Sequence, residues 1–271
     1  MKLAATLFSA TALALVSTAS FAADVVQTEA PIVAPPSVWN WTGFHVGIGG
    51  GAAYMHATSN SYSNLNWDVE GGYRAFGGEQ SDLGKFGVFG TVEGGYDFQM
   101  NQFVLGGLVD FNLQSLSAQT RSYASMQTNN NNFSNYNYAT HTASYKVGNS
   151  WDAGVRLGYL VNPRNLLYVT GGYSSADIRS GARLDVYYNN GNSHDWVDSH
   201  KSGWKSGYFI GFGLESLLTQ HLSLKAEYRF SDYGKVKTNY SFNNENGFYG
   251  SAASSASVNV HTVRLVLSYR F

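Results

Sequence analysis

The chain has 271 residues, of which 15% are aromatic and only 13% are charged, and its formal net charge is −1. So little charge disfavours an ordinary cytosolic enzyme, and so many aromatic residues disfavour a disordered chain. The near-zero net charge, without a basic cluster, gives no electrostatic footprint for nucleic acid. The absence of Cys excludes disulfides and thiolate metal sites.

The first segment, residues 1–22, has the pattern of a cleaved export signal. Lys2 precedes an apolar run that ends at Val16, and small residues follow as far as Ala22. We predict cleavage between Ala22 and Ala23. The apolar run is too short to span a bilayer, and no run of about 18 apolar residues occurs further along the chain.

Residues 23–40 hold three of the four prolines and show no apolar periodicity. This composition predicts an extended periplasmic N-terminal segment rather than a folded domain. We therefore expect the folded domain to comprise residues 41–271.

Within that domain, seven segments alternate apolar and polar residues over lengths greater than those of most ordinary strands, and an eighth, 166–176, is less cleanly phased but lies between two of them. They are 44–54, 86–98, 103–113, 151–161, 166–176, 208–214, 222–230 and 263–271. Their apolar ends recur about ten residues apart, as in Phe44 to Tyr54. A strand of this length, tilted by about 40° and rising about 3.3 Å per residue, spans roughly 25 Å, the height of the apolar band of an outer-membrane barrel.

Aromatic residues near the ends of these segments predict interfacial girdles at the two membrane surfaces. These residues are Tyr54, Tyr96, Phe98, Trp151, Tyr159 and Trp204.

The connections between the segments alternate in length. Short turns are expected at 99–102, 162–165 and 218–221, and long polar links at 58–83, 117–144, 180–203 and 234–256. Closure of the sheet would leave no unpaired edge in lipid. The pattern predicts an all-β fold, an eight-stranded antiparallel up-and-down transmembrane β-barrel with four long extracellular loops.

Several of these stretches resemble the alphaproteobacterial major outer-membrane proteins related to opacity-type surface antigens, a family with haemin-binding members. The stretches are WNWTGFHVG at 39–47, LLYVTGGY at 166–173, SLKAEYRF at 223–230 and HTVRLVLSYRF at 261–271. The resemblance implies an eight-stranded barrel in the cell outer membrane with both termini in the periplasm. It also implies that the terminal aromatics Tyr269 and Phe271 are read by the barrel-assembly machinery.

The inward-facing positions of the predicted strands carry charges of both signs. They are Lys85, Glu93, Asp97, Asp110, Asp152, Arg156, Glu215, Lys225, Glu227, Arg229 and Arg264. An eight-stranded barrel is just wide enough inside for side chains, and buried charges must be paired. The set therefore favours a structural salt-bridge network, and a narrow diffusion pore is the alternative.

The third long link carries two histidines, His194 and His200, with carboxylates between them. Imidazole ligates iron readily, and the family resemblance makes haem the first ligand to consider. The spacing matches no strong metal motif. We therefore favour a solvated loop without a cofactor, with haem binding as the alternative.

The sequence contains no G-x-S-x-G elbow, P-loop or H-E-x-x-H motif, so we predict that the protein is not an enzyme. We expect a mainly structural surface antigen. Its expected partners are outer-membrane lipid, the barrel-assembly machinery and, through the loops, host surface molecules or haem.

Overall fold

The computed structural model describes residues 39–67, 73–125, 127–128, 138–188, 193–243 and 248–271. The predicted export signal, most of the N-terminal segment and part of each long link lie outside these residues. No helix in the described part of the chain is long and apolar enough to span a membrane.

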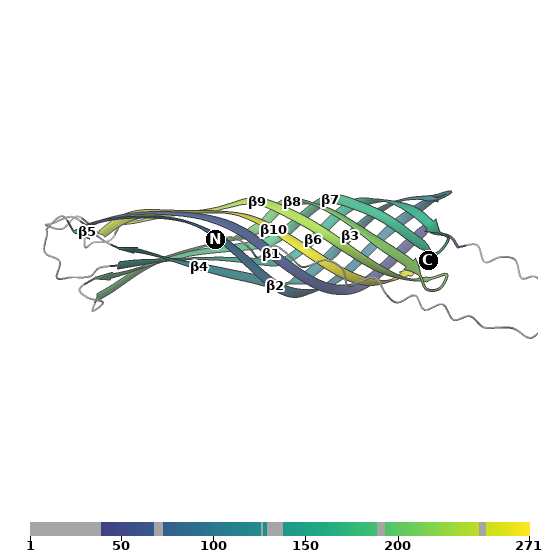
Figure 1. Cartoon of the computed structure of the whole chain (residues 1–271), viewed down its shortest axis with the longest axis horizontal. Helices are drawn as coiled ribbons and strands as arrows, with labels where there is room; N and C mark the ends of the chain where they lie inside the picture. Colours follow the sequence, from purple (N-terminus) through teal and green to yellow (C-terminus); the bar gives the residue numbers. More distant parts are fainter. Residues whose placement is uncertain (1–38, 68–72, 126, 129–137, 189–192, 244–247) are drawn as a thin grey trace, which may run out of the picture. The chain divides into compact units, whose positions relative to one another are not determined.

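The described residues form ten antiparallel strands (Figure 1). They are β1 (Gly43–Trp67), β2 (Tyr73–Met100), β3 (Phe103–Gln114), β4 (Leu116–Ser125), β5 (Gln127–Thr128), β6 (Tyr138–Asn162), β7 (Asn165–Tyr188), β8 (Ser193–Leu217), β9 (Leu222–Asn243) and β10 (Phe248–Arg270).

The sheet closes on itself because β1 pairs with β10 on one side and with β2 on the other. From β10 the ring continues through β9, β8, β7 and β6 to β3, which pairs with β2. After a break at Ser115, β4 continues from β3 along the edge of β6. The ring therefore has eight strand positions, and the predicted antiparallel β-barrel is confirmed.

Alternation of side chains gives the barrel an apolar outer belt. On β10, for example, Leu265 and Leu267 are exposed on the outside, whereas Arg264 is buried. Aromatic pairs lie at both margins of the belt. One margin has Phe44 with Tyr96 and Phe103 with Tyr159; the other has Tyr54 with Phe86 and Trp151 with Tyr173. Four of the six residues predicted for the girdles belong to these pairs: Tyr54, Tyr96, Trp151 and Tyr159.

Three short turns lie at one end of the barrel, within the predicted ranges 99–102, 162–165 and 218–221. The first includes Asn101, whose φ of 56° is a left-handed conformation that Asn tolerates. The chain ends at the same margin, where the Phe271 amide donates to the Phe44 carbonyl at 2.9 Å. Because outer-membrane barrels have short periplasmic turns, this end faces the periplasm.

The prediction of four long loops is wrong for most of the residues concerned. The strands do not end at the girdle but run on as hydrogen-bonded ladders, so that β1, β6 and β8 each have 25 residues. Ser, Asn and Thr interrupt the apolar pattern there without interrupting backbone pairing. We call this part of the molecule, beyond the outer girdle, the extension.

The extension consists of two β-sheets. Pairing of β8 with β9 stops at Tyr208 and Asp232, and pairing of β2 with β3 stops at Phe89 and Gln114. Beyond these points the described strands form one sheet in the order β5-β2-β1-β10-β9, in which β5 adds only two residues, and another in the order β4-β6-β7-β8. Figure 1 shows the strands separating into these two groups at the end far from the C-terminus.

An apolar core fills the space between the two sheets. It combines Met55 and Val258 from the first sheet with Tyr145, Val147 and Ile178 from the second, all nearly or fully buried. Hydrogen bonds cross the same interface, including one of 3.0 Å between the Ser59 and Tyr145 hydroxyls and one of 2.7 Å between the Ser180 and Thr238 hydroxyls. The extension is therefore a packed β-sandwich.

Candidate functional site: the charged lumen of the barrel

The membrane-spanning part of the barrel encloses a network of charged side chains. Ten of the eleven predicted residues are buried, and none of the ten is more than 7% exposed: Glu93, Asp97, Asp110, Asp152, Arg156, Glu215, Lys225, Glu227, Arg229 and Arg264. Lys85 differs from the prediction, because it lies beyond the belt and is exposed to solvent. The buried carboxylates thus come from β2, β3, β6, β8 and β9 and converge on a few cations.

The periplasmic half of the lumen is organised around Arg156. Its Nε donates to Asp97 Oδ1 at 2.8 Å and its Nη1 donates to Glu215 Oε2 at 2.7 Å. Arg270 bridges the same two carboxylates, since it bonds Asp97 and lies 3.2 Å from Glu215 Oε1. Ser223 donates a further hydrogen bond of 2.7 Å to Glu215. Two guanidinium groups therefore hold two carboxylates in one compact cluster.

The outer half of the lumen is organised around Arg229. Its Nη1 lies 2.8 Å from both Asp110 Oδ2 and Asp152 Oδ2, and its Nε donates to Glu227 Oε1 at 2.9 Å. The guanidinium also stacks on the ring of Phe209, with its carbon 4.1 Å from the ring centre. One cation thus neutralises carboxylates from three different strands.

Further contacts complete the network. Arg264 lies 3.5 Å from Asp110 Oδ1 and 3.6 Å from Glu227 Oε1, which places a second cation beside the outer cluster. Lys225 pairs with Glu93. Because every one of these carboxylates has a cationic partner, the network satisfies the requirement that buried charges be paired.

Bulky side chains close the periplasmic mouth of the lumen. Trp41 is fully buried and packs with Leu160, Leu166 and Leu217. Its indole Nε1 donates to the Pro163 carbonyl at 3.1 Å, which ties it to a periplasmic turn. At the other end, the lumen leads into the apolar core of the extension. The charged network is therefore enclosed between two apolar layers.

Sequence reasoning missed two members of the network, His45 and Arg270. His45 Nδ1 lies 3.4 Å from Asp97 Oδ2, and Arg270 donates to the Trp41 carbonyl at 2.6 Å. Both occupy inward positions by the same alternation that identified the other charges. The alternation of apolar and polar residues therefore identifies both residues as inward-facing, at the start of β1 and at the end of β10.

The two histidines proposed for haem lie in the extension. The His194 backbone belongs to β8 and is paired with Tyr187, but its side chain is outside the described residues. His200 is exposed, and its Nδ1 lies 3.7 Å from Asp198 Oδ2. Within the described ranges, no group of three or more His, Asp or Glu side chains is arranged to hold a metal ion.

A closed antiparallel ring with an apolar outer belt and a charged interior defines an outer-membrane β-barrel. The family model described as "Outer membrane protein beta-barrel domain" matches residues 8–271. The chain belongs to this family, and it is a protein of the bacterial outer membrane.

Named relatives agree with this class. The chain is similar to the 31 kDa outer-membrane immunogenic protein of Brucella melitensis, with 31% identity over 95% of this chain and 96% of that protein. It is also similar to the 25 kDa outer-membrane immunogenic protein of Brucella ovis, with 25% identity over 80% of this chain and 84% of that one. Among solved structures, the outer membrane protease OmpT of Escherichia coli aligns with a TM-score of 0.43 and 12% identity, over 84% of this chain and 97% of that one.

Proposed function

We propose that the protein is a closed, non-catalytic surface protein of the outer membrane, whose role is structural and antigenic. The observation that carries this proposal is the enclosed lumen, in which Arg156 and Arg229 bind carboxylates from opposite parts of the ring. A conducting path would have to break ion pairs between almost fully buried side chains, and breaking a buried ion pair costs several kcal/mol.

The proposed antigenic role rests on the extension and on the relatives. The extension carries polar outward residues well beyond the membrane, and its two sheets pack on an apolar core of their own. The relatives from Brucella are named as immunogenic outer-membrane proteins. A folded polar surface outside the cell is suited to recognition by antibodies and by host surface molecules.

Planar-bilayer recording of the refolded protein tests the closed lumen. The proposal predicts no stable unitary conductance steps. Insertion must be established independently in the same preparation, by the faster electrophoretic migration of the folded, unheated barrel. Stable steps from protein that passes this control would contradict the proposal and favour a narrow diffusion pore.

Cysteine labelling tests the surface display, because the natural chain has no Cys. We expect Lys237→Cys, at an exposed position in the extension, to react with a membrane-impermeant maleimide on intact cells. Gln220→Cys, in a periplasmic turn, is the matched control and should react only after the cells are lysed. The reverse pattern would contradict the orientation.

Two partner proposals have their own tests. Deletion of Phe271 should impair insertion if the barrel-assembly machinery reads this aromatic, and unchanged surface exposure would contradict that role.

Haem titration of the refolded protein should give a Soret shift that is lost in the double variant His194→Ala with His200→Ala if these histidines bind haem. The absence of a shift would remove haem as a ligand.

A further inference from the structure

A hollow of about 570 Å³ lies on the β4-β6-β7-β8 sheet of the extension. This volume is in the range of small-molecule binding sites. Two adjacent rungs of the sheet form the hollow. One rung aligns Ser117, Lys146, Arg179 and Ser202, and the other aligns Gln119, Ser144, Gly181 and His200. We call this feature the β6–β7 hollow.

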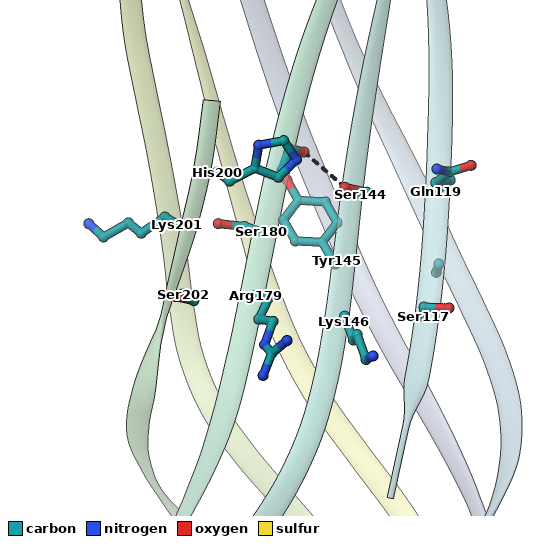
Figure 2. Close-up of a pocket in the computed structure, with 12 residues that line it drawn as sticks. Ser117, Gln119, Ser144, Tyr145, Lys146, Arg179, Ser180, His200, Lys201 and Ser202 are labelled. Atoms are coloured by element: carbon teal, nitrogen blue, oxygen red, sulfur yellow. Dashed lines mark hydrogen bonds between the residues drawn. The ribbon is translucent and has the colours of Figure 1, made fainter. Parts of the chain in front are cut away.

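Gly181 is one of the residues that line the β6–β7 hollow. A Cβ atom at this position would lie 2.7 Å from Ser144 Oγ and 3.1 Å from His200 Cδ2, so a larger residue would displace these two lining side chains. Ser144 donates a hydrogen bond of 3.4 Å to the Gly181 carbonyl, and Figure 2 shows Ser144 and His200 on either side of this point. The hollow is therefore set by the register of the sheet.

The β6–β7 hollow is cationic. Lys146 and Arg179 are partners on adjacent strands, and Figure 2 shows their side chains next to each other. Among the described residues, no carboxylate pairs with Lys146. Arg179 uses Nε and Nη2 to bind Asp177, at 3.0 and 2.8 Å, and its Nη1 keeps its donor capacity. Lys201 adds a third cation at the β8 edge, although its side chain points away from the other two.

The position of the β6–β7 hollow relates it to the membrane surface. Trp204, an exposed member of the outer girdle, is only two residues from Ser202 along β8. Trp151 is opposite Ser175, which is four residues from Arg179 on β7. At about 3.3 Å per residue and a tilt of about 40°, the hollow lies roughly 5 to 10 Å beyond the girdle. This is the depth at which lipid headgroups are found.

We propose that the β6–β7 hollow binds a phosphate group of the phosphorylated glycolipid in the outer leaflet of the outer membrane. Lys146 and Arg179 supply charge-assisted hydrogen bonds to the phosphate oxygens. The hydroxyl of Ser117 supplies a neutral one. The lipid is favoured over a soluble anion because the hollow opens outward beside the bilayer, where basic side chains are attracted to anionic headgroups.

The test uses the mature protein refolded in a neutral detergent and titrated with lipid A, with native mass spectrometry to count bound lipid. The double variant Lys146→Gln with Arg179→Gln removes the charges, and Gly181→Leu changes the shape of the hollow, by displacing Ser144 and His200, without changing charge. The matched control is Lys235→Gln with Lys237→Gln, which removes two exposed lysines from β9 in the other sheet. Every variant is first checked for folded electrophoretic migration.

The proposal predicts one tightly bound lipid A, with affinity reduced roughly tenfold or more in both hollow variants, as expected for loss of charge-assisted hydrogen bonds. The β9 control should bind like the natural protein, and dephosphorylated lipid A should not bind. Equal losses in the hollow and control variants, or equal binding of dephosphorylated lipid, would overturn the proposal. So would binding of pyrophosphate or of a sulfated polysaccharide without binding of lipid A.

Discussion

The barrel and the extension are built from the same strands but have opposite interiors. On β6, the inward positions Arg156 and Asp152 in the membrane give way to Val147 and Tyr145 in the extension. The outward positions change in the opposite sense, from an exposed Trp151 to Lys146 and Ser144. The solvent outside the strands decides the difference, because lipid favours apolar side chains outside whereas water favours them inside.

On β6 a bulge between Val147 and Ser150 shifts the inward positions from even-numbered to odd-numbered residues, whereas β10 passes through the same inversion of environment without a change of alternation. On β10, the inward side is kept from Arg264 through Thr262 to Val260 and Val258, all of them buried. Only the chemistry of the side chains changes. The same type of substitution, made once in the barrel and once in the extension, should therefore have different effects on stability.

The largest loss of stability is expected from Arg229→Leu, which removes the central cation of the outer cluster in the barrel. It leaves Asp110, Asp152 and Glu227 buried without their principal cation, and such losses cost about 3–5 kcal/mol. The free energy of unfolding in lipid vesicles, from urea titration followed by tryptophan fluorescence, measures the loss. The control is Arg183→Leu in the extension, where the guanidinium that pairs with Asp185 is itself exposed, so that its removal should destabilise the protein much less. Similar losses in the two variants would contradict the network.

The next effect tests the apolar belt. Leu265 is midway between Tyr269 and His261 on the outer face of β10, so Leu265→Arg places a charge near the middle of the bilayer. We expect this substitution to lower the free energy of unfolding by about 2–4 kcal/mol in the same titration. Ser255→Arg, on the same strand and the same face but in the extension, should cost no more than about 0.5 kcal/mol. A small cost at Leu265 would show that this face does not contact lipid.

A smaller effect is expected for Ile178→Ala, which leaves a cavity in the extension core and should cost about 2–3 kcal/mol locally. Because the extension has its own core, limited proteolysis should cut it faster while the barrel keeps its folded migration. The control is Ile210→Ala in the barrel, where lipid fills the space left by the side chain. Loss of the whole barrel in Ile178→Ala would contradict the independence of the two regions.

The smallest effect concerns the hydrogen bond between Ser180 and Thr238, which joins the two sheets of the extension. Ser180→Ala leaves the buried Thr238 hydroxyl without this partner and should cost about 1 kcal/mol. A double-mutant cycle with Thr238→Val isolates the interaction. A coupling energy near zero would mean that the apolar core alone holds the sheets together.

The barrel could be predicted from the sequence because its alternation is strong: large apolar residues such as Ile48 and Leu265 oppose charges such as Arg264. The extension could not be predicted from the sequence, because small residues such as Ala57 and Ala256 fill its inward positions and weaken the alternation of apolar and polar residues. The charged lumen residues were predictable from alternation. Their ion-pair partners could not be predicted, because residues far apart in the sequence come together only when the ring closes. Arg229 and Asp110, for example, are separated by 119 residues of chain.

A nitroxide scan along β10 tests the inversion most directly, using single cysteines introduced from residue 255 to residue 267 in the refolded protein. We predict that alternate positions from Ala256 to Arg264 are inaccessible throughout. The intervening positions should change from water-accessible at Ser255 to lipid-accessible at Leu265, as measured by collision with a polar reagent and with oxygen. Collision of the polar reagent with labels at Thr262 and Arg264, or of oxygen in lipid with labels at Val258, would contradict the account.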